Sequence, residues 1–346
     1  MPEKPCFAAT SMAFLPHRDT TAAVDAILKN FPEAPCLPVL SRSIRHMLEG
    51  LPALVFDRQK KQVRLDPSPE REKEIIEFYD NVENNNLDAF ATTKKAAPGF
   101  YAMLERLRAA PPPGLKWIAY QTAGPVLMGE IIKDPDGRSA FYNETLRDIL
   151  IKGVNMKARW LEREIKGRVP GAEVINGLPE TTLVSFTSAG GSGSRAAIIE
   201  AIESGCRELQ GLKWVHCCAN IDWSLLTGSG VDVINFDAYQ HLERILLHHE
   251  DFGAFLKRGG MLAWGIVPVT DESIGSVRAQ DLADRLQAGI DGFAAKGMDE
   301  YGLAASSWIM PCCDANLMQI QNAEKAFEMT SEISRIMRKR YGFPDS

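Results

Sequence analysis

A histidine and two cysteines occupy the stretch WVHCCAN at residues 214–220, and their spacing suits metal binding. The apolar residues that precede them are typical of a buried β-strand. Side chains alternate between the two faces of a strand, so His216 and Cys218 point to one side and Cys217 to the other. An imidazole and a thiolate at positions i and i+2 form half of a tetrahedral zinc site. The alternative is a pair of cysteines buried as small hydrophobes beside a histidine bonded to a backbone carbonyl.

A second cysteine pair, in IMPCCDAN at residues 309–316, follows another apolar run, and Asp237 closes the apolar run VDVINF. In a parallel barrel the strand ends meet at one face, so residues far apart in the sequence converge there. Two thiolates and an imidazole select zinc over magnesium or calcium. Three protein ligands leave a fourth position open, as in catalytic zinc sites. We therefore predict a zinc ion bound by His216, Cys218 and Cys313, with Asp237 as a further ligand or beside the ligands and in a catalytic role.

The composition excludes several classes of protein. Of 346 residues, 45% are hydrophobic and 24% are charged, and the net charge of −6 argues against nucleic acid or an anionic membrane as partner. No apolar run approaches the roughly 20 residues that span a bilayer, and the start MPEKPCFAAT does not resemble a signal peptide. Seven cysteines, four of them in adjacent pairs, make a disulfide framework improbable. We expect a cytoplasmic protein.

Short apolar runs alternate with amphipathic helical stretches along the chain, which predicts an α/β fold. We expect one domain over residues 1–346: a (β/α)8 TIM barrel with an N-terminal elaboration, an excursion of a hairpin and helices over about 50–110. Strands are expected at 6–15, 115–120, 181–186, 212–218, 231–237, 261–268 and 304–313. The principal helices are expected at 20–31, 68–110, 140–168, 195–209, 241–260, 276–297 and 321–341.

The motifs of the second half resemble the catalytic barrel of cobalamin-independent methionine synthase. More broadly, they resemble the superfamily shared with uroporphyrinogen decarboxylase and the corrinoid:coenzyme M methyltransferases. In the methyltransferases an H-x-C motif and the cysteine of a P-x-C motif bind zinc, and here these are residues 216–218 and 311–313. In methionine synthase the strand after H-x-C ends in an acidic zinc ligand within D-V-I-x-x-E. The stretch DVINFD places Asp237 there, one methylene shorter than glutamate.

The first half carries two further points of resemblance. LPHRDTTAAVDAIL at residues 15–28 is similar to the L-P-H start of smaller relatives. His17, next to Arg18, would bind a carboxylate or assist a leaving group. A histidine that only precedes a helix is the alternative. QTAGP at residues 121–125 is similar to a Q-x-x-G-P loop of the superfamily. This similarity implies that Gln121, Gly124 and Pro125 contact the cofactor or methyl donor.

Two loops complete the set of candidates. Asp222 directly follows the zinc strand, where a carboxylate would pair with a substrate amino group or would cap a helix. AGGSGS at 189–194 either binds an anion through backbone N–H groups or only connects two elements. Relatives carry an acidic D-E-P turn after the strand expected at 181–186, and no acid follows it in this chain.

The resemblance implies a zinc-dependent methyltransferase that moves a methyl group to a thiol such as homocysteine. The implied partners are a small thiol substrate and a donor, either methyltetrahydrofolate or a methylated corrinoid protein. One alternative is a lyase like uroporphyrinogen decarboxylase, which needs no metal and holds substrate carboxylates with arginines. The other is a non-catalytic barrel that binds zinc or a corrinoid. The cysteines and histidine favour the methyltransferase, because a decarboxylase has no use for thiolates.

Overall fold

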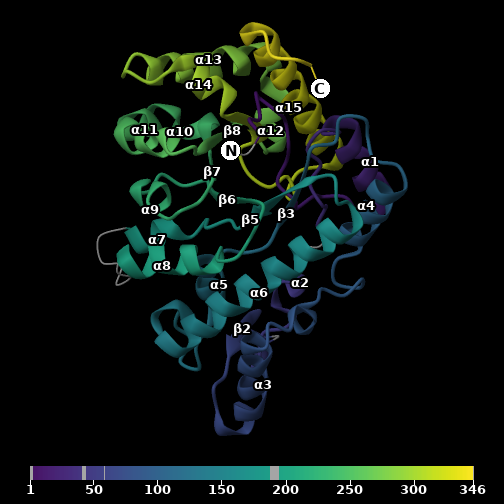
Figure 1. The fold of residues 1–346 in the computed structure, drawn as a ribbon, viewed down its shortest axis with the longest axis vertical. Coiled ribbons are helices and arrows are strands. Elements are labelled where there is room, and N and C mark those ends of the chain that lie inside the picture. The colour runs from purple at the N-terminus through teal and green to yellow at the C-terminus, as the bar shows by residue number, and fades with distance from the viewer. Residues whose placement is uncertain (1–2, 41–43, 58, 188–194, 346) are drawn as a thin grey trace.

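The structure is a computed structural model, and it describes residues 3–40, 44–57, 59–187 and 195–345 (Figure 1). Its centre is a parallel sheet of six strands in the order β3-β5-β6-β7-β8-β9. The strands are β3 (Trp117–Gln121), β5 (Glu173–Gly177), β6 (Leu212–Cys217), β7 (Val233–Phe236), β8 (Met261–Val267) and β9 (Ser307–Pro311). The fold is therefore mixed α/β, with a parallel sheet of six regular strands at its centre.

This sheet is strongly curled, so that side chains of its two edge strands meet in the interior. The indole rings of Trp117 on β3 and Trp308 on β9 have centroids 4.8 Å apart, although four strands separate them in the sheet. Both side chains are almost completely buried. Aromatic rings pack edge to face at this separation, and each one buries a large apolar area. The interior of the curled sheet is thus a packed core.

Two N-terminal segments lie between the edge strands. Residues 7–15 bond to β9, where Phe7 N–H donates to Ser307 O at 2.7 Å. Residues 35–39 bond to β3, where Leu37 N–H donates to Ala119 O at 2.8 Å. Isolated parallel bridges pair Ala9 with Ile309, Phe14 with Val39, and Cys36 with Ala119. Prolines at positions 35 and 38 have no N–H to donate, which explains why the second segment forms no regular ladder.

The strand expected at residues 181–186 is wrong. Helix α7 (Leu183–Thr187) lies there, and β5 occupies the place between β3 and β6. The run TTLVSF has the β-branched residues that favour strands, but pairing with neighbours decides the structure. Only Val174 and Ile175 are strongly apolar in β5, so its sequence signal is weak. The loop that connects this region to the next helix, AGGSGS, lies outside the described residues.

Helices cover the outside of the sheet. They are α1 (Thr20–Asn30), α5 (Pro125–Ile131), α6 (Glu144–Arg168), α7, α8 (Arg195–Gly205), α9 (Ser224–Thr227), α10 (Ala238–Ile245), α11 (His249–Lys257), α12 (Asp271–Ser276), α13 (Ala279–Ala294), α14 (Glu300–Ala305) and α15 (Ile320–Tyr341). Asn143 begins the longest, α6, by accepting the N–H of Leu146, and Gly342 ends α15 with a φ of 71°. In the described part of the chain, no helix combines the length and apolarity that crossing a membrane requires.

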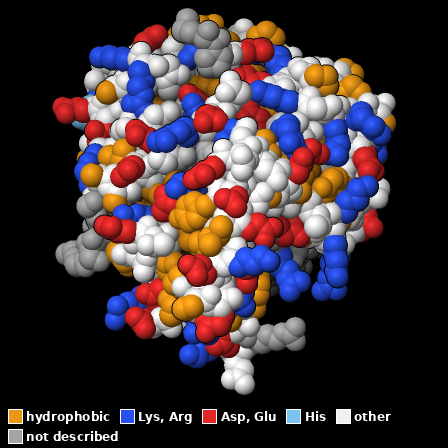
Figure 2. Space-filling view, turned by 60° about the horizontal axis from the view of Figure 1, so that its bottom comes forward, with side chains coloured by type: hydrophobic (Ala, Val, Ile, Leu, Met, Phe, Trp, Pro, Cys, Tyr) orange, Lys and Arg blue, Asp and Glu red, His pale blue; other side chains and the backbone are white. Residues whose placement is uncertain are grey.

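The N-terminal elaboration projects from one side of the molecule. Strand β1 (Leu54–Asp57) pairs antiparallel with β2 (Gln62–Leu65), as expected for the hairpin, and β2 pairs with β4 (Ile132–Lys133). Its helices are α2 (Arg45–Leu48), α3 (Glu72–Glu83) and α4 (Pro98–Ala109), and the 3-10 turns η1 (Pro69–Arg71) and η2 (Leu87–Phe90) lie among them. Two further 3-10 turns lie elsewhere: η3 (Ala140–Tyr142) before α6, and η4 (Leu246–His248) between α10 and α11. Helix α3 extends farthest from the sheet (Figure 1). On the face shown in Figure 2, basic and acidic side chains are interspersed.

Candidate metal centre

Three of the predicted ligands lie together. His216 is on β6, Cys218 follows β6 and Cys313 follows β9, and their ligand atoms all lie within 4.8 Å of one another. Two strands separate β6 from β9 in the sheet, so the curl brings these side chains together. In a tetrahedral zinc site the ligand atoms are about 3.3–3.8 Å apart, given the usual zinc bond lengths. Small side-chain adjustments would therefore let all three reach one ion.

The hydrogen bonds of His216 leave one ring nitrogen available to a metal. Asn235 lies opposite His216 on β7 and donates from Nδ2 to the carbonyl of Ala263 at 2.8 Å. Its Oδ1 therefore faces Nδ1 of His216, at 2.5 Å, and this ring nitrogen must carry the proton. Nε2 keeps its lone pair, is buried and has no hydrogen-bond partner among the described residues. An unpaired buried acceptor is costly, and binding a metal ion would satisfy it.

The two thiols influence each other's ionisation. The neighbouring thiol of Cys313, and secondarily the imidazole of His216, lower the pKa of Cys218. The same contact with Cys218, together with burial, raises the pKa of Cys313. The pair without a metal thus favours one thiolate and one thiol. A divalent cation stabilises thiolates, so it would allow both cysteines to ionise and would release a proton on binding.

The other cysteine of each pair lies outside this group. Cys217 is buried on the opposite side of β6, its Sγ lies 3.8 Å from the carbonyl of Ala219, and burial raises its pKa to about 12. Cys312 is also buried, and burial raises the pKa of its thiol above the usual range. Neither sulfur belongs to the group of ligand atoms that lie within 4.8 Å of one another. The alternation along the chain therefore separates the candidate ligands from the packing cysteines.

Asp237 lies near the candidate metal centre but caps a helix. It caps the N-terminus of α10, where Oδ1 accepts the N–H of Gln240 and Oδ2 accepts its Nε2, both at 2.8 Å. Burial raises its pKa, and the Cys218 charge acts in the same direction. Its oxygens do not belong to the group of ligand atoms within 4.8 Å. Both oxygens are engaged at the start of α10, so the structure shows Asp237 as a helix cap.

Asp314, which the sequence analysis did not single out, lies directly after Cys313. Its Oδ1 accepts the N–H of Phe14 at 3.2 Å, and its Oδ2 is 3.5 Å from Nε2 of Gln121. Oε1 of Gln121 in turn accepts the N–H of Ala13 at 2.8 Å. These bonds tie β3, the N-terminal segment and the loop after β9 together. The available signal was the position of an acid beside a predicted ligand at a strand end.

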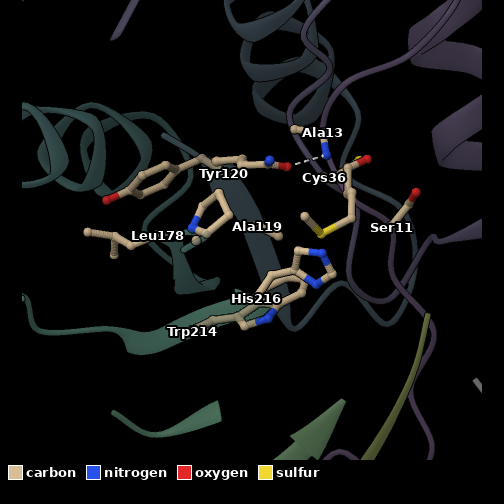
Figure 3. A pocket seen from close by; sticks show the side chains of 12 residues that line it. Ser11, Ala13, Cys36, Ala119, Tyr120, Leu178, Trp214 and His216 are labelled. Carbon is tan, nitrogen blue, oxygen red and sulfur yellow. Dashed lines mark hydrogen bonds between the residues drawn. The ribbon is translucent and has the colours of Figure 1, made fainter. Parts of the chain in front are cut away.

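A narrow pocket borders the imidazole of His216. Its walls come from β3, β6, the loop after β5 and the two N-terminal segments, and they include Gln121, Trp214 and Cys36. Figure 3 shows His216 between Trp214 and the segments that carry Ser11 and Cys36. Most of the lining atoms are apolar, and no Lys or Arg side chain among the described residues contributes to it. Gln121, expected to contact a cofactor, thus lies at the edge of the metal centre.

Glu180 lies between β5 and the run at residues 181–186 where a strand was expected, so its place at a strand end was not predicted. It follows β5 within LPE, is fully buried, and burial raises its pKa to about 8. Its two oxygens accept the N–H groups of Val126 at 3.0 Å and Leu127 at 2.6 Å. The expectation that no acid stands after this strand is therefore wrong. The carboxylate caps helix α5.

This cap also defines the roles of Gly124 and Pro125, which were expected to contact a cofactor. A Cβ at Gly124 would lie 2.3 Å from Oε1 of Glu180, so only glycine lets the carboxylate approach the helix. Pro125 occupies the first turn of α5, where its missing N–H costs nothing. Since Glu180 takes the amides that an anionic cofactor would need, we find these two residues shaping the start of α5.

The remaining candidates lie apart from the three ligands. His17 is buried, with Nε2 3.2 Å from Oε1 of Glu324 on α15. Asp222 is half exposed and forms an ion pair at 2.6 Å with Arg195, at the start of α8. It also accepts the N–H of Ser224 at 3.1 Å, which is a capping role. Neither side chain belongs to the group of ligand atoms within 4.8 Å, and Asp222 already has a cationic partner.

Comparison with protein families finds no match, and comparison with curated proteins finds none. Among solved structures, the chain is similar to a B12-independent methionine synthase from a Shewanella species in complex with selenomethionine: 19% identity, 68% of this chain and 67% of that chain covered, TM-score 0.49. It is also similar to a GH113 β-mannanase from Alicyclobacillus acidocaldarius (13% identity, 98% of each chain, TM-score 0.42). An endo-1,4-β-mannanase from Rhizomucor miehei follows (11% identity, 98% and 96% covered, TM-score 0.35). The chemistry of the centre must therefore be argued from its own residues.

Proposed function

We propose that this chain is a zinc-dependent enzyme that transfers a methyl group to a thiol. The observation that carries the proposal is the state of His216. Its Nδ1 is committed to Asn235, while Nε2 lies buried and unpartnered among the described residues, beside the thiols of Cys218 and Cys313. A histidine held in this way by a neighbour is the usual arrangement of a metal ligand.

The donor set favours zinc in a catalytic rather than a structural site. One imidazole nitrogen and two thiolates are soft ligands that suit zinc. A structural zinc site has four protein ligands, whereas His216, Cys218 and Cys313 supply three and leave room for a substrate atom. When bound, zinc acts as a Lewis acid that keeps a thiol deprotonated near neutral pH. Thiol activation is the chemistry that this arrangement serves best.

The side chains of the chain have distinct tasks in this proposal. His216, Cys218 and Cys313 hold the metal, and Asn235 holds the imidazole in the tautomer that exposes Nε2. The acceptor thiol loses its proton, and its sulfur attacks the methyl carbon of the donor. An S–C bond forms, and the methyl–donor bond breaks with its electron pair left on the donor. The narrow, mainly apolar pocket beside His216 helps to exclude water from the sulfur.

The motif order supports this proposal, since H-x-C at 216–218 and P-x-C at 311–313 are similar to zinc motifs of thiol methyltransferases. The donor in that case is methyltetrahydrofolate or a methylated corrinoid protein, and homocysteine is the first acceptor to test. A decarboxylase of the uroporphyrinogen type would hold its substrate with arginines. The pocket beside His216 has none among its described lining residues. The methyltransferase interpretation is therefore favoured over the lyase.

We also propose that residues 7–15 and 35–39 act as two irregular strands that complete an eight-stranded barrel. Their backbone bonds to β9 and to β3 support this interpretation. A barrel of this kind gathers its reactive residues at the carboxyl ends of the strands, where the three ligands lie. A single domain over residues 1–346 and a cytoplasmic location stay predictions.

The decisive experiment is a methyl-transfer assay on purified, zinc-loaded protein. Homocysteine is incubated with methyltetrahydrofolate in one reaction and with a methylated corrinoid protein in another, and methionine is measured by mass spectrometry. We expect product with one donor and none after Cys218→Ser. Bound zinc without transfer from either donor would contradict the enzyme proposal and leave a non-catalytic zinc barrel.

A further inference from the structure

A second pocket lies in the N-terminal elaboration, apart from the metal centre. Its volume is about 480 Å³, and side chains from α2, β1, α3 and residues 93–96 line it. Among the described residues, it shares no lining side chain with the pocket beside His216. Small-molecule sites in proteins have volumes of about 300–1,000 Å³. The pocket is therefore large enough for a ligand of its own, and the proposed methyl transfer does not use it.

One part of the lining is apolar. Leu48, Leu51, Leu54 and Phe56 contribute to it, and the side chain of Phe56 is 49% exposed. Leu51 is held against α6, because a Cβ at Gly153 would lie only 2.2 Å from its Cδ2. Exposed apolar surface beside polar residues is typical of ligand-binding sites. An apolar group of a ligand would cover this surface and remove it from water.

The acids of the lining are engaged by other groups of the chain. The two carboxylate oxygens of Glu49 accept the N–H and the hydroxyl of Thr93, each at 2.8 Å. Glu74 accepts the N–H of Ala53 at 2.9 Å and is bonded to Arg71 at 2.9 Å. These bonds connect the segments that surround the pocket. Its shape is thus formed before a ligand binds, which lowers the cost of ordering on binding.

The basic side chains of the lining are Arg45 and Lys95. The guanidinium carbon of Arg45 lies 5.8 Å from the ring centroid of Phe56, so a positive charge lies beside the exposed ring. Lys95 is exposed and belongs to no ion pair within 4.0 Å in the part of the chain that the structure describes, whereas the preceding residue, Lys94, pairs with Glu105. The pocket therefore combines apolar surface with positive charge.

We propose that this pocket binds a small amphipathic carboxylate, whose apolar chain or ring lies on Leu54 and Phe56 and whose carboxylate contacts Arg45 and Lys95. Guanidinium and ammonium groups bind carboxylates through charge-assisted hydrogen bonds. Each methylene that the ligand buries adds roughly 4-fold to its affinity. A small polar anion would leave the apolar lining wet, and an amphipathic cation would meet charges of its own sign. The inference is independent of the metal centre.

The test measures displacement of anilinonaphthalene sulfonate, a fluorescent amphipathic anion, from the purified full-length protein at neutral pH. Octanoate and octylammonium compete with the probe, and they have the same apolar chain but opposite charges. We expect octanoate to displace the probe at about 10-fold lower concentration, because the basic side chains attract it and repel the amine. Acetate, which lacks the chain, should not compete at these concentrations. Equal competition by octanoate and octylammonium, or a protein that does not bind the probe, would overturn the proposal.

Variants at exposed positions then assign the site. Lys95→Gln should weaken octanoate binding about 3-fold to 5-fold, and Phe56→Ser should weaken octanoate and octylammonium alike. Lys325→Gln and Leu247→Ser, at an exposed lysine and an exposed leucine elsewhere, are the matched controls. Cys218→Ser, which removes a proposed metal ligand, should bind octanoate as the wild type does, whether or not the protein transfers methyl groups. Octanoate binding that survives unchanged in Lys95→Gln and Phe56→Ser, or is lost in Cys218→Ser, would place the ligand elsewhere and refute the proposal.

Discussion

Nδ1 of His216 and Oδ1 of Asn235 lie 2.5 Å apart on neighbouring strands, and both side chains are buried. Asn235 is itself oriented by its bond to the carbonyl of Ala263. The strand register therefore determines which nitrogen of the histidine faces the two cysteines. A polar residue in the middle of an apolar strand thus has a task that its own strand does not reveal.

The first prediction concerns this asparagine. Asn235→Leu removes the acceptor for Nδ1, so the tautomer is no longer fixed, and we expect zinc affinity to fall by about 10-fold to 100-fold. Competition with a chromophoric chelator measures the affinity. Asn235→Asp, which keeps an acceptor for Nδ1–H, is the control and should retain zinc. Unchanged affinity in the leucine variant would mean that the histidine is not a ligand through Nε2.

The vicinal cysteines provide a matched set of four variants. Cys218→Ser and Cys313→Ser should each lower the zinc content sharply, because each removes a thiolate ligand. Cys217→Ala and Cys312→Ala should keep zinc, since these thiols are buried outside the ligand group. Metal content is measured by elemental analysis on protein whose folding has been checked by circular dichroism. Similar losses in all four variants would contradict the assignment.

Two variants of Asp237 distinguish a helix-capping role from a role as a metal ligand. Asp237→Asn keeps an oxygen for the N–H of Gln240, so we expect zinc affinity close to that of the wild type. Asp237→Ala removes the cap of α10 and should lower the free energy of unfolding by about 1 kcal/mol, measured by urea denaturation. A loss of zinc affinity of 10-fold or more in the asparagine variant would return Asp237 to the ligand shell.

Lys157 should make the stability of the fold depend on pH. It is buried on α6, its Nζ lies 3.0 Å from Oγ1 of Thr92, and burial lowers its pKa to about 7 from an ordinary value of 10.5. The unfolded chain binds the proton more tightly than the folded chain between these values, so stability should rise with pH from about 7 towards 10.5. Urea denaturation of the wild type and Lys157→Met should show this rise in the wild type alone. Parallel pH profiles would mean that the ammonium is not desolvated.

The sequence predicts the metal ligands better than their surroundings, for a physical reason. Alternation along one strand is a local property, so the separation of Cys218 from Cys217 can be deduced from spacing. The roles of Asn235 and Asp314 depend on neighbours 19 and 300 positions away, His216 and Phe14, which no local pattern contains. A buried asparagine within an apolar run was nevertheless a signal, since such a residue needs a partner.

The fold shows the same division. Long amphipathic helices such as α6 and α15 and the apolar strands β6 to β9 were predictable from periodicity. The strand β5 was missed because two apolar residues, Val174 and Ile175, carry its signal, and the more β-prone run after it became α7. The missed strand also concealed Glu180 and its cap on α5. Pairing energy from neighbouring strands, rather than local propensity, decided this region.

Zinc X-ray absorption spectroscopy tests the central claim most directly. On the purified protein it should show two sulfur neighbours, at about 2.3 Å, and one nitrogen neighbour from His216, Cys218 and Cys313. Saturation with homocysteine should raise the sulfur count to three, because the acceptor thiolate enters the open position. A shell that homocysteine leaves unchanged, or a protein that binds no zinc, would contradict the account.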